Sequence, residues 1–318
     1  MPDVSVVIPT YNRLDFLKTA IASCFDGNDG VDIEVVVVDD GSTDGTCEWL
    51  RKQRNPRVRP IFQEQKGAQH ARNAGLDVAQ GETIKFLDDD DQLVEGALQD
   101  EVRLLKQSGA GVGYGDLRIQ QEGANQSVFQ QRKTQNLIAG IFDGAIWTHP
   151  HVFIYKRSVL ESVSWDTNLS YEQDKDFAIR VAAKKPKVIY LNRPVGIFNI
   201  HDGDRISNLK SNTSVVERCL RRIRLIERGL SEMQEHGLIG EQERQAAARG
   251  MWRSAYMFAP YDIEMFENVW VQIETIAPGF CPNRSVSILS VSDKLIGPLH
   301  TERIINPFRK LKNRLSTE

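Results

Sequence analysis

The sequence predicts an α/β fold with a doubly wound, mostly parallel sheet, followed by a helical appendage. Short apolar runs alternate with amphipathic helical patterns over roughly the first 110 residues, an alternation typical of parallel sheets covered by helices. Polar clusters follow three of the predicted strands, and apolar residues beyond residue 210 recur at helical spacing. We therefore expect a domain of residues 1–209 and a helical C-terminal region of residues 210–318.

The elements of the first half follow from the spacing of their apolar residues. Gly41 and Ser42 favour a turn before the second helix, and Gly81 ends the third. The predicted strands are 4–8, 33–40, 58–62 and 83–88, and the predicted helices are 14–25, 44–53, 68–81 and 94–109. In such sheets ligands bind beyond the carboxyl ends of the strands. The clusters "PTYNR", "DDGSTD" and "DDDD" should therefore share one crevice.

Composition narrows the classes of protein to consider. The chain has 318 residues, 41% of them hydrophobic, and a net charge of -3, so nothing indicates a nucleic-acid partner. The four cysteines lack metal-ligand spacing, which is typical of free thiols in a reducing compartment. Because no basic leader or membrane-length apolar run is present, we expect a cytoplasmic protein.

The stretch "ETIKFLDDDDQLVEG" (82–96) places four carboxylates directly after a strand. Neighbouring carboxylates repel one another and raise each other's pKa unless a cation lies among them. Neither GxGxxG after the first strand nor GxxxxGK[ST] is present, so the common phosphate-binding loops are not supported. A hard cation, Mg²⁺ or Mn²⁺, bound by carboxylate oxygens could neutralise a diphosphate here. A solvated acidic turn that caps the next helix is the alternative.

Five ordered motifs carry a resemblance to a known family. They are "VSVVIPTYNR", "VVVVDDGSTDGT", "KGAQHARNAG", "IKFLDDDDQL" and "YEQDKDFAIRVA" (171–182). Over roughly residues 3–205 the chain resembles the family 2 glycosyltransferases of GT-A fold. The resemblance implies an inverting, metal-dependent glycosyltransferase that moves a sugar from a nucleoside diphosphate, UDP foremost, to a hydroxyl acceptor. It implies a saccharide, lipid-linked or protein acceptor in polysaccharide or glycoconjugate synthesis.

The resemblance also implies a binding site for the nucleotide-sugar. Tyr11 would stack on the base, and Asp40 would accept the uracil imide hydrogen; a loop tyrosine and a helix-capping aspartate are the alternatives. Arg72 could hold one of the aspartates 88–91 or a diphosphate oxygen, and a surface salt bridge on its helix is the alternative. The full implied set is Pro9, Thr10, Tyr11, Arg13, Asp40, Gly67, Arg72, Asp88 and Asp89.

Two further roles follow from the same resemblance. Asp88 and Asp90 match the aspartate pair of the family best, so Asp90 is the expected metal ligand, joined by His201. Asp174 matches the catalytic base, although Gln173 stands where the family usually has glutamate. Ordinary first-turn helix acids are the alternative for Asp174.

The segment "AIWTHPHVFIYKRS" (145–158) matches the acceptor side of the family. Trp147 could stack on a sugar ring there, and aromatic core packing is equally consistent with the sequence. His149 and His151 lie in the same segment.

Two other functional classes compete with a transferase. A non-catalytic nucleotide-sugar-binding or assembly module would keep the crevice and lack a competent base. A phosphatase with a DxD nucleophile fits less well, because Gln92 does not match and Tyr11 and Asp174 would have no role.

The C-terminal "INPFRKLKNRLSTE" reads as a short basic amphipathic helix, able to make peripheral contact with the inner face of a membrane.

Overall fold

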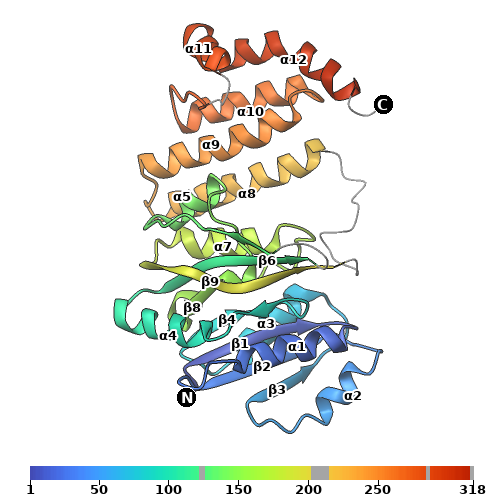
Figure 1. Ribbon diagram of the computed structural model, residues 1–318. Helices are drawn as coiled ribbons and strands as arrows, with labels where there is room; N and C mark the ends of the chain where they lie inside the picture. The colour runs from blue at the N-terminus through green and yellow to red at the C-terminus, as the bar shows by residue number, and fades with distance from the viewer. Residues whose placement is uncertain (122–125, 202–214, 284–286, 316–318) are drawn as a thin grey trace. The chain divides into compact units, whose positions relative to one another are not determined.

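The computed structural model describes residues 1–121, 126–201, 215–283 and 287–315. The chain forms two compact units, one of Met1–Leu137 with Ile146–Gly203 and the other of Ile138–Ala145 with Asp204–Glu318. The predicted boundary between residues 209 and 210 lies outside the described residues. Figure 1 shows the chain coloured from its N-terminus to its C-terminus.

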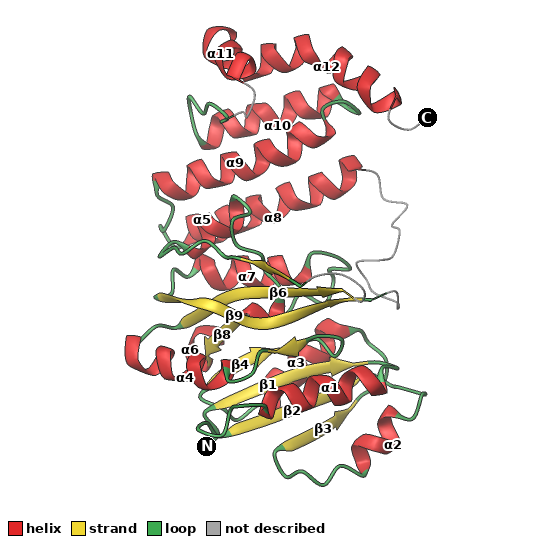
Figure 2. Ribbon diagram, viewed as in Figure 1, coloured by secondary structure: helices red, strands yellow, loops and turns green. Residues whose placement is uncertain are grey.

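The first unit is built on a single sheet with the strand order β3-β2-β1-β4-β8-β6-β9-β5, and β7 beside β6 (Figure 2). The strands are β1 Val4–Thr10, β2 Ile33–Asp39, β3 Val58–Phe62, β4 Thr83–Phe86, β5 Gln92–Leu93, β6 Val112–Gln121, β7 Ser127–Phe129, β8 Phe153–Lys156 and β9 Val188–Ile200. Strands β1 to β4 are parallel, as predicted. Strand β8 runs antiparallel to β4 and β6, and β9 returns parallel to β6.

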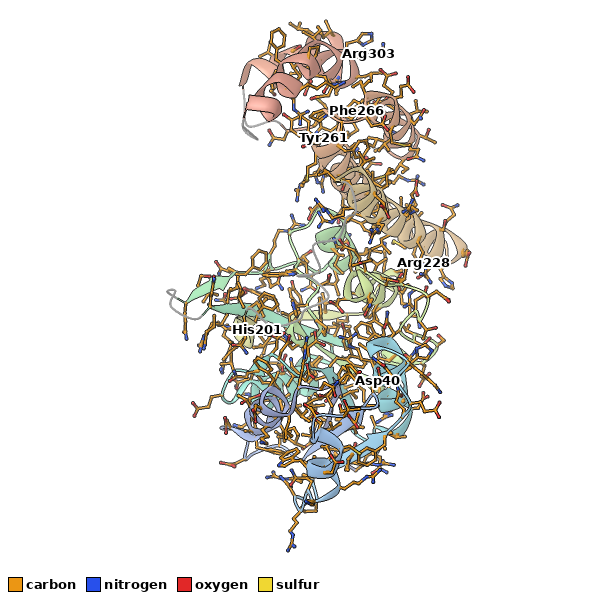
Figure 3. The ribbon with its side chains drawn as sticks, turned by 90° about the vertical axis from the view of Figure 1, so that its right-hand side faces the viewer. Asp40, His201, Arg228, Tyr261, Phe266 and Arg303 are labelled. Atoms are coloured by element: carbon orange, nitrogen blue, oxygen red, sulfur yellow. The ribbon has the colours of Figure 1, made fainter. Side chains whose placement is uncertain are left out.

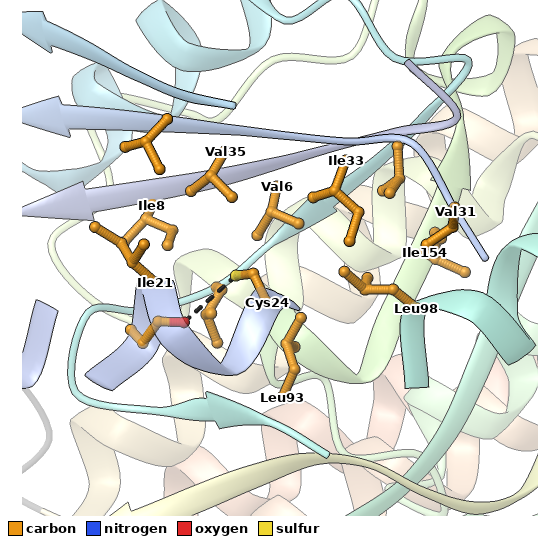
Figure 4. Close-up of a cluster of buried hydrophobic side chains, with 14 of the residues drawn as sticks. Val6, Ile8, Ile21, Cys24, Val31, Ile33, Val35, Leu93, Leu98 and Ile154 are labelled. Atoms are coloured by element: carbon orange, nitrogen blue, oxygen red, sulfur yellow. Dashed lines mark hydrogen bonds between the residues drawn. The ribbon is translucent and has the colours of Figure 1, made fainter. Parts of the chain in front are cut away.

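Helices cover both faces of the parallel strands. On one face, α1 (Leu14–Phe25) and α4 (Ala97–Ser108) pack over alternate β1 residues such as Val6 and Ile8 (Figure 4). The Cys24 thiol in this cluster donates to the Ala20 carbonyl at 3.4 Å. On the other face lies α3 (Ala68–Val78), where a Cβ on Gly75 would stand 2.4 Å from a Val7 methyl. The predicted doubly wound α/β fold is confirmed.

Shorter helices and one longer helix complete this unit. They are α2 Thr46–Arg51, the 3₁₀ turn η1 Pro150–Val152, α6 Arg157–Leu160 and α7 Gln173–Ala183. Phe177 of α7 packs edge-on against Phe86 of β4 at 5.4 Å and stacks on Trp165 at 4.3 Å. This aromatic contact anchors the first turn of α7 beside the end of β4.

The second unit is helical, which confirms the predicted appendage. It contains α8 Val215–Glu235, α9 Glu241–Phe258, α10 Ile263–Ile276, α11 Ser287–Ile296, α12 Pro298–Leu315 and most of α5 Leu137–Phe142. Helix α9 packs against both α8 and α10. A Cβ on Gly250 of α9 would stand 2.1 Å from the Phe142 carbonyl oxygen, so a glycine is required where α5 crosses α9.

The C-terminal basic helix is present as the second half of α12, and its last residues, 316–318, lie outside the described residues. Ile304 and Phe308 are 58% and 71% exposed. Arg309, however, pairs with the buried Glu302 at 2.8 Å and stacks on Tyr256 at 3.9 Å. One of the predicted basic residues therefore holds the unit together. Within the described residues, no helix combines the length and apolarity that a bilayer crossing requires.

Candidate functional site

The residues 88–91, here called the acidic row, lie in the turn that follows β4. The Asp91 amide donates to the Asp88 carbonyl at 3.1 Å, which bends the row. The Thr10 hydroxyl at the end of β1 donates to Asp89 at 2.7 Å. Asn12, at φ 54°, accepts from the Thr43 amide at 2.7 Å. The three polar clusters predicted from the strand ends therefore do adjoin one another.

Arg13 supplies positive charge to the middle of the acidic row. Its Nη1 lies 3.1 Å from Asp89 Oδ1 and 3.0 Å from Asp90 Oδ2. Burial raises the pKa of Asp89 to about 6, while the Arg13 charge and the Thr10 hydrogen bond oppose that rise. The positive charge of Arg13 therefore offsets part of the repulsion between the carboxylates of the row.

Arg72 supplies positive charge to the first residue of the row. The side chain is buried in α3, with Nη2 2.5 Å from Asp88 Oδ1 and the guanidinium 4.5 Å from the centre of the Trp165 ring. Burial alone would raise the pKa of Asp88, but Arg72, His149 and Arg13 outweigh it and lower that pKa. A surface salt bridge, the alternative for Arg72, is excluded by its burial.

Asp174 lies in the first turn of α7, near the Arg72–Asp88 pair. Glu172 adopts φ 56° immediately before the helix, and Gln173 accepts from Arg72 Nη1 at 3.4 Å. Burial raises the pKa of Asp174 to about 7; Arg72 opposes this rise, and the negative charges of Asp88 and Glu172 add to it. A carboxylate with a pKa near neutrality is suited to proton transfer at physiological pH.

Asp40 holds the loop that begins α3. Its carboxylate accepts from Gln63 Nε2 at 2.6 Å and from the Lys66 and Gly67 amides at 2.8 Å each. Gly67, at φ 97°, is the residue before the helix. These contacts show how Asp40 shapes the loop, and its nucleotide contact stays a prediction.

The other predicted nucleotide residues lie at the end of β1. Pro9 is paired with Val38 inside the sheet, and Tyr11 is 39% exposed just beyond the strand. Tyr11 is therefore accessible to a ligand in this region. Asp40 and His201 both belong to the first unit, where Figure 3 labels them.

His201 lies beside the third residue of the row. Its Nε2 is 3.2 Å from Asp90 Oδ2, and its ring stacks on Phe16 of α1 at 4.6 Å. A cavity of about 360 Å³ lies between α1, Asp90 and Asn199 of β9. The 3.2 Å separation of His201 Nε2 from Asp90 Oδ2 is that of a hydrogen bond, and Arg13 contacts the same Asp90 oxygen at 3.0 Å. A carboxylate oxygen and an imidazole nitrogen are also ligand types that bind Mn²⁺.

The last residue of the row joins two histidines, a grouping that the sequence analysis missed. Asp91 Oδ2 lies 3.4 Å from His151 Nδ1 and 3.8 Å from His149 Nδ1. The three residues could hold a metal ion. The His-Pro-His spacing was the available signal, but only the fold brings it to Asp91.

Trp147 packs edge-on against Phe129, His149 and Phe198 at 5.3 to 5.8 Å. Trp147 therefore takes part in aromatic packing, which was the alternative to stacking on a sugar ring. Trp147 thus adds a packed wall beside His149.

Comparison with known proteins identifies a family and several relatives. The family model described as glycosyl transferase family 2 matches residues 5–164. A Campylobacter jejuni protein named GalNAc(5)-diNAcBac-PP-undecaprenol beta-1,3-glucosyltransferase is 28% identical over 65% of this chain and 68% of its own length. A succinoglycan biosynthesis protein of Rhizobium meliloti is 32% identical over 51% of this chain, and the match spans only 48% of that relative.

Solved structures share the fold at low identity. S. aureus TarS, residues 1–349 in complex with UDP-GlcNAc, has a TM-score of 0.66 and 17% identity, covering 97% of this chain and 92% of that one. A Pyrobaculum calidifontis mannosyltransferase in complex with GDP-Man and Mn²⁺ has a TM-score of 0.51 and 16% identity, covering 97% and 88%. Because these two proteins bind different nucleotides, the shared fold does not indicate which nucleobase this chain binds.

Proposed function

Since this chain belongs to glycosyl transferase family 2, we propose that it transfers a sugar from a UDP-sugar to an acceptor hydroxyl with inversion at the anomeric carbon. The observation that carries this proposal is Asp174, whose pKa is raised to about 7 by burial next to the Arg72–Asp88 pair. A carboxylate that titrates near neutrality supports a transferase over a binding module. The product would enter a polysaccharide or glycoconjugate.

In the proposed reaction, the Asp174 carboxylate removes the proton from the acceptor hydroxyl. The acceptor oxygen forms a bond to the anomeric carbon while the bond from that carbon to the diphosphate oxygen breaks on the opposite face. The nucleoside diphosphate leaves with the electron pair of that bond. Burial raises the pKa of Asp174, Arg72 opposes the rise and Asp88 adds to it, and together they bring this pKa to about 7.

Asp90 and His201 would hold a Mn²⁺ or Mg²⁺ ion, because a carboxylate oxygen and an imidazole nitrogen adjoin one another there. When bound, the cation supplies charge stabilisation to the diphosphate. Arg13, which contacts Asp89 and Asp90, would orient these carboxylates. Thr10, Tyr11, Asp40 and Gly67 would line the nucleotide side.

For the acceptor, we propose a lipid-linked saccharide, because the Campylobacter jejuni relative is named for a PP-undecaprenol-linked one. The protein would then work in the cytoplasm at the inner face of the membrane. The exposed Ile304 and Phe308 of α12 would support peripheral contact. Phe308→Ser should weaken binding to anionic vesicles, whereas Val271→Ser, at an exposed position on α10, should not; equal binding by all three proteins would rule the contact out.

The experiment that tests the function incubates the purified chain with UDP-sugars, Mn²⁺ and candidate acceptors. Transfer, or slow hydrolysis of the donor, is expected with the wild type, and transfer should fall strongly in Asp174→Asn. Nucleotide binding without turnover would instead support a binding module, and phosphate release from simple monoesters would support a phosphatase. Calorimetry with UDP, GDP and ADP tests the base preference, for which UDP should bind most tightly.

A further inference from the structure

Two imidazoles and one carboxylate converge at the last residue of the acidic row. Asp91 and the His151 ring are almost fully buried, and the His149 side chain is 13% exposed. One ligand atom from each of the three residues lies within 4.8 Å of the other two. These residues come from the turn after β4 and from the start of η1, so the fold alone brings them together.

The separations fit ligands of one ion better than a direct hydrogen bond. Two atoms that each lie about 2.1 Å from a tetrahedral ion stand roughly 3.4 Å apart. Asp91 Oδ2 is 3.4 Å from His151 Nδ1 and 3.8 Å from His149 Nδ1. Hydrogen bonds from nitrogen to oxygen are typically shorter, about 2.7 to 3.2 Å. The remaining gap to His149 can close by ring rotation, because this ring is the least buried of the three groups.

The surrounding residues hold the Asp91 and His151 side chains in place. Asp91 Oδ1 accepts from the Asn199 amide of β9 at 2.9 Å, which directs Oδ2 to the histidines. A Cβ on Gly196 would stand 2.0 Å from the His151 ring, so a glycine leaves the space that the ring fills. Supporting contacts of this kind orient the ligands of metal sites.

From this geometry we propose that Asp91, His149 and His151 bind a borderline divalent transition-metal ion such as Zn²⁺, at a site separate from Asp90 and His201. Two imidazoles and one carboxylate form a known ligand set for Zn²⁺. Mg²⁺ prefers oxygen ligands throughout, so this site should discriminate against it. The bound ion would tie η1 to the turn that carries Asp90. Its role is therefore to position the acidic row.

The test uses the full chain, stripped with a chelator and free of nucleotide. Zn²⁺ titration followed by elemental analysis should show tight binding of one ion per chain, and the melting temperature should rise with Zn²⁺. His151→Asn and Asp91→Asn should each weaken Zn²⁺ binding by at least about tenfold. Co²⁺ should give the visible absorption of a tetrahedral site in the wild type and lose it in these variants.

Two controls separate this site from others. His201→Asn should retain the Zn²⁺ affinity, because His201 lies on Asp90, and so should His236→Asn, which removes an exposed histidine of the second unit. If circular dichroism shows that His151→Asn does not fold, the Zn²⁺ affinity of His149→Asn is the deciding measurement, because the His149 ring is less buried.

The proposal is overturned if the stripped wild type neither binds Zn²⁺ nor gains thermal stability from it. It is also overturned if Zn²⁺ affinity falls only in His201→Asn. Because no nucleotide or sugar is present in these measurements, either result leaves the proposed transferase activity to be judged separately. Loss of sugar transfer by Asp174→Asn alone would likewise not bear on Zn²⁺ binding.

Discussion

The two ends of the acidic row carry different kinds of counter-charge. At the first end, Asp88 pairs with the buried guanidinium of Arg72. At the last end, Asp91 faces the imidazoles of His149 and His151. Between them, Arg13 contacts both Asp89 and Asp90.

A guanidinium stays protonated over the whole physiological range, whereas an imidazole can gain a proton or bind a metal ion. The Asp88 end therefore has a fixed charge, against which the neighbouring Asp174 titrates near neutrality. The Asp91 end has imidazoles that can take up either a proton or a metal ion. From this difference we infer that proton transfer takes place beside Asp88 and that cations bind at Asp90 and Asp91.

The largest effect should come from Asp174→Asn, which keeps the size of the side chain and removes the base. Transfer should fall by about 10² to 10⁴ fold, the usual contribution of a positioned proton acceptor. UDP affinity should barely change, because Asp174 is proposed to act only on the acceptor. Glu172→Gln is the matched control, since it removes the adjacent carboxylate. A similar loss in both variants, or lost UDP binding in Asp174→Asn, would contradict the assignment.

A smaller loss is expected at the proposed cation ligands. Asp90→Ala should remove the Mn²⁺-dependent part of UDP affinity, and His201→Asn should weaken it by about 10 to 100 fold. Calorimetry with and without Mn²⁺ measures both effects. The same affinity gain from Mn²⁺ in Asp90→Ala and in the wild type would show that Asp90 does not hold the catalytic cation.

The pH profile tests the fixed charge at Arg72. Only the ionised Asp174 can accept a proton, so transfer should rise with pH through about 7 and then level off, and one pH unit below that midpoint it should be about tenfold lower. Arg72 lowers the pKa of Asp174, so Arg72→Gln should move the midpoint upward. Arg72→Lys keeps the charge and should move it less. Equal midpoints in all three proteins would remove Arg72 from this role.

The parallel half of the sheet was predictable because each strand is a short apolar run that ends in a polar cluster. The strands β1 to β4 begin at the predicted residues and end within two residues of the predicted positions. The second half of the sheet was not predicted in the same way. Strand β9 contains Pro194, and its pairing with β6 shifts register near Asp116. Such irregularity breaks the alternation that sequence reasoning depends on.

The candidate site shows the same limit. Motif order correctly placed Thr10, Arg13 and the acidic row near one another, because strand ends in a parallel sheet are adjacent. The pairing of each arginine with a particular aspartate depends on side-chain packing, as does the fully buried Lys85–Glu101 pair at 2.6 Å. Contacts of this type join elements whose separation in sequence gives no signal.

The smallest effect concerns the thermal stability of the protein and its dependence on Asp174, which lies beside the first end of the row. The pKa of Asp174 rises from 3.8 to about 7 on folding, mainly through burial. The folded state therefore binds this proton more tightly than the unfolded state, so the ionised side chain costs stability. This cost is absent below the unfolded pKa, grows as pH rises through the folded pKa and is complete above it. Asn carries no charge at any pH.

Asp174→Asn should consequently melt a few degrees higher than the wild type at pH 8, with little difference at pH 4 and below. Thermal melts across this range measure the change. Asp89→Asn is the matched comparison, because the pKa of Asp89 is also raised, to about 6. Asn offers only one acceptor oxygen there, whereas the two Asp89 oxygens accept from Thr10 and Arg13. A higher melting temperature in Asp174→Asn, without one in Asp89→Asn, would mean that ionised Asp174 costs stability. It would also mean that the contacts of Asp89 with Thr10 and Arg13 offset the cost of its burial. No pH-dependent gain at Asp174 would show that its carboxylate is not held at a raised pKa, and the proposed base would lose its main physical support.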